Sequence, residues 1–136
     1  MRTILFLSMM LAASVVGAQN KLTVTVDGIE NPNGKVFVAV FDSINFLKQP
    51  LYYGMAQIEQ GEEEVTIVIE NVASGNYAVT VFQDENDNGK LDTGAYGKPT
   101  EKIGFSNNAA VKMGPPEFQD CMITVEEDSE INITLK

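Results

Sequence analysis

Apolar and polar side chains alternate over several short stretches of the chain, and this pattern predicts β-strands. Residues 21–27 place Leu22, Val24 and Val26 on one face and threonines on the other, as in a strand with one buried side. The same alternation recurs over residues 64–70, 76–83, 118–125 and 130–135. Glycine, asparagine and proline separate these stretches, so a series of short strands joined by turns is expected.

Two further stretches depart from simple alternation. Residues 35–41 carry apolar side chains on both faces, which is typical of a central strand whose second face is covered by another element or loop. Residues 42–58 are less regular, and we expect a short helical turn around Pro50 followed by a strand through Ala56 and Ile58. About seven short strands without a long helix predict an all-β fold, an antiparallel β-sandwich of immunoglobulin-like or transthyretin-like (prealbumin-like) kind.

The region between residues 84 and 116 lacks this strand rhythm. It holds an acidic loop beginning at Asp84 and a polar, glycine-rich run that ends at Pro116. A connection of this length without secondary structure usually carries function or is disordered. Within it, Ser106, Asn107 and Asn108 are expected to satisfy backbone groups of the loop through local side-chain hydrogen bonds.

The first 18 residues have the features of a secretory signal peptide. Arg2 supplies a positive start, residues 4–16 are apolar, and Val16-Gly17-Ala18 provides the small side chains that signal peptidase requires. Cleavage is expected before Gln19, which leaves residues 19–136 as a single β-sandwich domain. We therefore expect an exported protein, periplasmic or extracellular, with no membrane insertion after cleavage, rather than one held by an uncut anchor.

The composition narrows the possible chemistry. The 136 residues include 19 acidic and 9 basic side chains, no histidine and one cysteine. Without histidine this chain alone has no imidazole base and no histidine metal ligand. One cysteine cannot form an intrachain disulfide, and Cys121, in phase with Ile123 and Val125, is expected in the core. A formal net charge of −10 disfavours nucleic acid as a partner and favours cations, basic surfaces or neutral ligands.

Residues 84–92 resemble the first part of an EF-hand calcium loop. Oxygen-bearing side chains occupy relative positions one, three, five and nine, and Gly89 occupies position six, where the sharp turn around the ion requires glycine. The expected calcium ligands are the side chains of Asp84, Asn86, Asn88 and Asp92 and the main-chain carbonyl of Lys90. The twelfth position, normally a bidentate glutamate, is Ala95, so Glu101 is the expected substitute, with Asp87 or water as alternatives.

A simpler interpretation of this loop is that Asn88-Gly89 forms a type I′ turn in a solvated hairpin. Charge crowding favours the ion, because four carboxylates and one lysine fall within residues 84–92 and like charges repel unless a cation lies among them. Only two of the proposed side-chain ligands are charged. The affinity for Ca²⁺, the one cofactor expected, should therefore be weak, about 10⁻⁴ to 10⁻³ M.

Two alternative functions depend on other side chains. A carbohydrate-binding module would use exposed aromatic rings, and Tyr96 and Phe105 are the candidates because both fall in the long loops. The remaining aromatic candidates for a sugar platform are more simply explained as core residues: Tyr52, Tyr53 and Phe118. A hydrolase that uses paired carboxylates is least favoured, because no GxSxG, P-loop or HExxH motif is present.

A longer set of motifs resembles one protein family. The segments that carry the resemblance are GKVFVAVFDS at 34–43, GNYA at 75–78, DENDNGKLD at 84–92, GKPTE at 97–101, GFSNNA at 104–109 and GPPEFQD at 114–120. Together they resemble the bacterial exported family called domain of unknown function (DUF) 2141, over essentially the whole chain after residue 18. The resemblance implies a signal peptide, a β-sandwich and no established activity, and it supplies no catalytic residue. The acidic loop is also similar to calcium loops of adhesin β-sandwich repeats, an analogy of site.

These features predict an exported, non-catalytic β-sandwich that binds calcium in the loop of residues 84–92. The expected partner is a protein or a glycan of the cell envelope. No nucleic acid, no membrane insertion after cleavage and no disulfide partner is expected.

Overall fold

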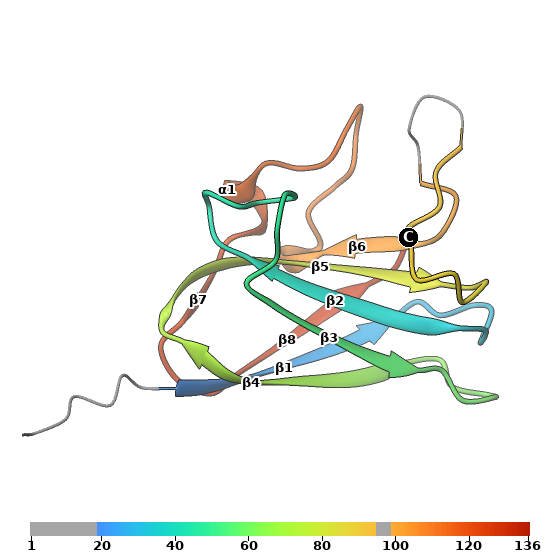
Figure 1. The fold of residues 1–136 in the computed structure, drawn as a ribbon, viewed down its shortest axis with the longest axis horizontal. Helices are drawn as coiled ribbons and strands as arrows, with labels where there is room; N and C mark the ends of the chain where they lie inside the picture. The colour runs from blue at the N-terminus through green and yellow to red at the C-terminus, as the bar shows by residue number, and fades with distance from the viewer. Residues whose placement is uncertain (1–18, 95–98) are drawn as a thin grey trace, which may run out of the picture.

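Two β-sheets packed face to face form the body of the protein (Figure 1). The computed structural model describes residues 19–94 and 99–136. The predicted signal peptide, together with Ala95 and Tyr96, lies outside these residues. In the part of the chain that is described, no helix has the length and apolar character needed to cross a membrane.

Eight strands make up the two sheets in residues 19–94 and 99–136. The three-stranded sheet has the order β4 (Val65–Ala73), β1 (Gln19–Asp27) and β8 (Ser129–Thr134). The five-stranded sheet has the order β3 (Tyr52–Gln57), β2 (Lys35–Phe41), β5 (Gly75–Asp84) and β6 (Ile103–Phe105), and β7 (Ile123–Val125) pairs with the start of β5. The predicted all-β sandwich is confirmed.

The alternation in the sequence explains which faces of the sheets are buried. Leu22, Val24 and Val26 of β1 are fully buried, while the threonines between them are partly exposed. The inward-facing valines of β2 and β5 join them in one apolar core. Most strand pairs are antiparallel, as predicted, but β1 and β8 run parallel, with Val24 opposite Ile131. A parallel pair needs a long connection, and here the whole chain between the two strands supplies it.

The predicted strand over residues 118–125 is wrong in its first half. Phe118–Cys121 form a short helix, α1, and only Ile123–Val125 form a strand. A capping box starts the helix, since the side chains of Glu117 and Asp120 each accept a hydrogen bond from the other residue's backbone N–H. These local bonds favour a helical turn over the strand that the apolar pattern suggests. Cys121 is buried, as predicted.

The segment before β3 also differs from the prediction. Residues 43–48 form consecutive turns rather than a helical turn around Pro50, and Leu47 has a φ of 58°. The predicted strand follows but ends at Gln57, one residue before the buried Ile58. Strand β6 is absent from the prediction, because three residues are too few to show a period of two.

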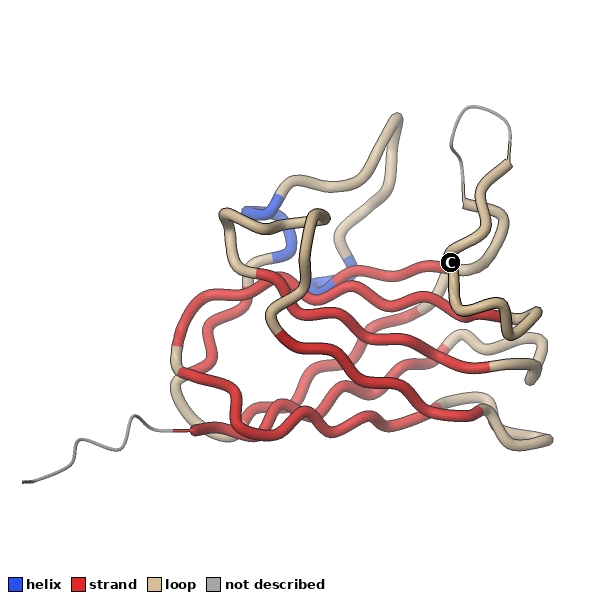
Figure 2. The backbone as a smooth tube through the Cα atoms, in the orientation of Figure 1, coloured by secondary structure: helices blue, strands red, loops and turns tan. Residues whose placement is uncertain are grey.

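A second apolar cluster explains why β2 and β5 are apolar on both faces. On the outer side of the five-stranded sheet, one set of buried and partly buried residues packs together: Ala78, Phe105, Cys121, Phe46 and Phe118. The turns of residues 43–48 and α1 thus cover one end of this face (Figure 2). At the other end, the rings of Phe37 and Phe82 stack with their centroids 5.2 Å apart and remain partly exposed.

A short 3₁₀ helix, η2 (Ser106–Asn108), follows β6, and its side chains bond to neighbouring segments of the chain. The Ser106 hydroxyl accepts a hydrogen bond from the backbone of β5. Asn107 donates to the carbonyl that follows α1, and Asn108 accepts from the backbone of β8. All three side chains therefore bond to backbone groups, but these groups belong to segments distant in sequence, so the prediction of local bonds within the loop is wrong.

Candidate cation-binding loop

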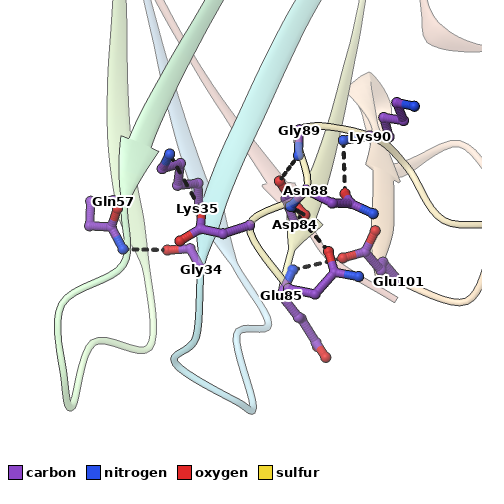
Figure 3. Close-up of polar contacts among 11 residues, drawn as sticks. Gly34, Lys35, Gln57, Asp84, Glu85, Asn88, Gly89, Lys90 and Glu101 are labelled. Carbon is purple, nitrogen blue, oxygen red and sulfur yellow. Dashed lines mark hydrogen bonds and ion pairs between the residues drawn. The ribbon is translucent and has the colours of Figure 1, made fainter.

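The acidic loop starts at Asp84, where β5 ends (Figure 3). The Asp84 side chain is buried, and both of its carboxylate oxygens accept hydrogen bonds from the backbone of the loop. Oδ2 lies 2.7 Å from the Gly89 nitrogen, and Oδ1 lies 3.2 Å from the Asn88 nitrogen. Asp84 therefore folds the loop back over the end of the strand, and Gly89 adopts a φ of 76° that glycine tolerates.

The turn before β2 anchors the base of the loop. Gly34 has a φ of 77°, and a Cβ at this position would come within 1.8 Å of the Asp84 carbonyl oxygen. Lys35 is the β2 partner of Asp84, and its Nζ lies 3.4 Å from Asp87 Oδ1. The pairing of Lys35 with Asp84 and the close approach of Gly34 to the Asp84 carbonyl together determine the position of Asp84.

The four predicted side-chain ligands form one connected cluster. The backbone N–H of Asn88 donates to both Asp84 Oδ1 and Asn86 Oδ1, at 3.2 and 3.3 Å, so these two oxygens converge on one hydrogen. The side-chain nitrogens of Asn86 and Asn88 donate to Asp92, at 2.6 and 2.7 Å. Asp84, Asn86, Asn88 and Asp92 are therefore brought together, as the spacing in the sequence predicts.

The electrostatics of this cluster favour an ionised Asp92. Side-chain hydrogen bonds from Asn88 and then from Asn86 lower the pKa of the Asp92 carboxyl below its ordinary value of 3.8, and the positive charge of Lys90 contributes in the same direction. Hydrogen bonds that stabilise the charged form of an acid always act in this sense. At neutral pH the Asp92 side chain is thus negatively charged.

Glu101 has a structural role that its place in the sequence does not predict. Its Oε2 accepts a hydrogen bond from the Glu85 N–H at 2.7 Å, and its Oε1 accepts one from the Asp92 N–H at 2.9 Å. One carboxylate thus joins the two ends of the loop, and Figure 3 shows its bond to Glu85. The Thr100 N–H donates to the Asp92 carbonyl at 2.9 Å, which brings Glu101 alongside the loop.

The remaining predicted ligands lie in or beside the loop. The backbone N–H of Lys90 donates to Asn88 Oδ1 at 2.9 Å, and Asp87, the alternative ligand, pairs with Lys35. Within residues 19–94 and 99–136, no three histidine, cysteine, aspartate or glutamate side chains are grouped so that they could hold a metal ion. A cation in this loop would therefore need the asparagine oxygens in addition to the carboxylates.

The aromatic residues proposed for a sugar platform are mostly packed. Phe105, expected on a loop, lies in β6 with 6% of its surface exposed, so its assignment as an exposed ring is wrong. Tyr96 lies outside the described residues. Tyr52 packs edge-on against Tyr77 with ring centroids 6.0 Å apart, whereas Tyr53 is 80% exposed.

The single cysteine does not provide a reactive thiol. Burial raises the pKa of Cys121 to about 11, and the negative charge of Asp120 adds a smaller contribution. At neutral pH the thiol is therefore protonated, and only the thiolate is nucleophilic.

The fold and the loop define a small all-β protein, a sandwich with an oxygen-rich loop at one end of its five-stranded sheet. The chain belongs to the family described as an uncharacterized protein conserved in bacteria (DUF2141), whose model matches residues 24–134. No curated protein and no solved structure matches the chain.

Proposed function

We propose that this protein is an exported, non-catalytic β-sandwich that binds a calcium ion in the loop of residues 84–92 and presents a surface to a partner at the cell envelope. The observation that carries the proposal is the cluster in which two carboxylates and two asparagine amides meet. Asp84 Oδ1 and Asn86 Oδ1 already point at the same hydrogen. Both asparagines reach the same carboxylate, that of Asp92.

The amide groups can become ligands by rotation of their side chains. Both asparagines direct their Nδ2 atoms at Asp92. A half-turn about the last side-chain torsion exchanges the nitrogen and the oxygen of an amide, and this torsion is soft and roughly two-fold. A cation beside Asp92 would thus replace two N–H donors. The same rotation releases the hydrogen bonds that Asn86 Oδ1 and Asn88 Oδ1 accept from the backbone N–H groups of Asn88 and Lys90.

The chemistry of the ligands favours calcium over other metals. The set consists of carboxylate and amide oxygens, and a histidine ligand is excluded because the chain contains none. Calcium accepts six to eight such oxygens in flexible geometry, whereas magnesium demands near-octahedral geometry and keeps several waters. The hydrogen bonds of Glu101 to both ends of the loop support the proposal, since they hold the ligands together before an ion arrives.

Calorimetric titration of residues 19–136 with CaCl₂ tests the proposal. The expected dissociation constant is about 10⁻⁴ to 10⁻³ M, and Asp92→Asn should weaken binding about tenfold or more because it removes one of two charged ligands. Asp87→Asn is the matched control, since it removes the same charge from the same loop at a residue that pairs with Lys35. Its calcium affinity should stay close to that of the wild type.

A rise in stability provides the second measurement. At ten times its dissociation constant, calcium should add about 1.4 kcal/mol to the free energy of unfolding. No binding heat and an unchanged melting temperature at millimolar calcium would refute the proposed function. Equal losses of affinity in Asp92→Asn and Asp87→Asn would refute the assignment of the ligands.

Export is the second part of the proposal, and it is supported by the apolar run of residues 4–16 and by the small residues that end at Ala18. Mass spectrometry of the protein recovered from the envelope fraction or the medium of expressing cells should give an N-terminus at Gln19. A chain that stays in the cytoplasm and keeps residues 1–18 would contradict export.

A further inference from the structure

Strand β3 forms an open edge of the five-stranded sheet. It bonds to β2 on one side and, among the described residues, to no strand on the other. Its six residues, Tyr52–Gln57, contain no charge and no proline. Edge strands usually carry such residues because an exposed row of backbone N–H and C=O groups otherwise pairs with another chain.

The exposed side chains of this edge are apolar. Tyr53 is 80% exposed and Met55 is 58% exposed, and Leu51, just before the strand, is 47% exposed. Single exposed apolar residues are common on protein surfaces, but neighbouring ones on an open edge mark an interaction surface. The edge therefore offers backbone hydrogen bonds and apolar contact to the same partner.

Three of the other sheet edges in the described part of the chain are protected. Strand β4 carries Glu70 and strand β8 carries Glu130, both exposed. Strand β6 is bonded beyond its own sheet, because Ile103 and Lys136 exchange two backbone hydrogen bonds at 2.9 and 3.3 Å. Among the described strands, β3 is the longest unpaired edge without a charged side chain, since the other one, β7, has only three residues.

We propose that β3 pairs antiparallel with β3 of a second copy of the chain, so that the two five-stranded sheets become one continuous sheet. A two-fold axis at Gly54 gives a self-complementary register. Tyr53 then lies opposite Met55 of the second copy, and Tyr52 lies opposite Ala56 of the second copy. Aromatic rings pack favourably against thioethers, and large residues fit opposite small ones. The same two contacts repeat on both sides of the axis, as a two-fold interface requires.

Charge also favours a second copy as the partner. Lys48, exposed, precedes β3, and Glu59, exposed, follows it. Antiparallel pairing brings the start of one strand beside the end of the other, so each copy's Lys48 approaches Glu59 of the other copy. The chain has a net charge of −10, and elsewhere two copies repel, but this edge combines a neutral centre with complementary ends.

Sedimentation velocity of residues 19–136 over micromolar to millimolar concentrations tests the proposal. The wild type should change from one to two chains, and Met55→Lys should raise the dimer dissociation constant about tenfold or more, because it places a charge at each side of the axis. Met113→Lys is the matched control, since it makes the same substitution at a fully exposed residue in the loop before α1. It should dimerise as the wild type does.

A charge exchange checks the register with variants outside the strand. Lys48→Glu should weaken the dimer, and the double variant Lys48→Glu with Glu59→Lys should restore it, while melting temperatures stay unchanged. A wild type that stays monomeric at every concentration would overturn the proposal, even if it takes up an added extended peptide at this edge. A Met55→Lys variant that dimerises like the wild type would overturn it as well.

Discussion

Asp92 depends on its asparagine neighbours for its electrostatic state. Asn88 and Asn86 donate to its two oxygens and lower its pKa below 3.8. A lowered pKa in the folded state means that the ionised group stabilises the fold above the ordinary pKa. This contribution is lost as the pH falls through the lowered value. The loop should therefore stay ordered at a pH at which an ordinary aspartate is already protonated. It should lose order only at a lower pH.

Asn88→Ala should move the pKa of Asp92 back toward 3.8, because it removes the largest cause of the shift. Carbon-13 NMR of the side-chain carboxyls during a pH titration measures the change directly. Asn132→Ala, at an exposed position of β8, is the control and should leave Asp92 unchanged. An identical Asp92 titration in the Asn88 variant and the wild type would contradict the assigned cause.

The sequence predicts some roles in this loop and misses others. The spacing of Asp84, Asn86, Asn88 and Asp92 indicates which side chains meet, because a glycine at the sixth position turns alternate residues inward. The bonds of Glu101 to Glu85 and Asp92 depend on the pairing of two chain segments that are distant in sequence. No local pattern records such a contact, so Glu101 was predicted as a ligand and not as a connection between the loop ends.

At the scale of elements, the turn before β2 determines where the loop begins. Gly34→Ala should lower the free energy of unfolding by about 2 kcal/mol or more, because a Cβ would overlap the Asp84 carbonyl oxygen and strain a positive φ. Urea unfolding measures this loss. The same substitution should also weaken calcium binding, since it displaces Asp84.

The loss of stability in Gly34→Ala combines steric overlap with backbone strain, and Gly61→Ala measures the strain alone. Gly61 has a φ of 87°, and a Cβ there would meet nothing within 4 Å. Only the backbone strain should remain, at about 1 kcal/mol, with calcium affinity unchanged. Equal effects of the two substitutions would show that the contact between Gly34 and Asp84 does not hold the loop.

The elements that the sequence predicts well are those with one buried face. The alternation in residues 21–27 and 64–70 reflects inward and outward side chains, so β1 and β4 follow from it. Helix α1 does not, because four residues with apolar ends satisfy either a strand or one helical turn. The side chains of Glu117 and Asp120 favour the helical turn over the strand, because each accepts a hydrogen bond from the backbone of that turn.

For the whole molecule, the sandwich gathers acidic turns at one end. The turns between β1 and β2, between β3 and β4, and after β5 lie at the same end of the sheets (Figure 1). They contain Glu30, Glu62, Glu63 and Glu64 in addition to the carboxylates of the loop. A surface of one sign attracts counter-ions. The strand order that brings these turns together, with β1 and β8 parallel, arises from long-range pairing that period-two alternation does not encode.

Calcium binding by the loop can be followed residue by residue through the backbone amide resonances of residues 19–136 during a calcium titration. Saturable shifts are expected at Asn86, Asn88 and Gly89 in the millimolar range, with β1 and β4 unaffected. Unchanged loop resonances at millimolar calcium, or shifts spread evenly over the acidic surface without saturation, would contradict it.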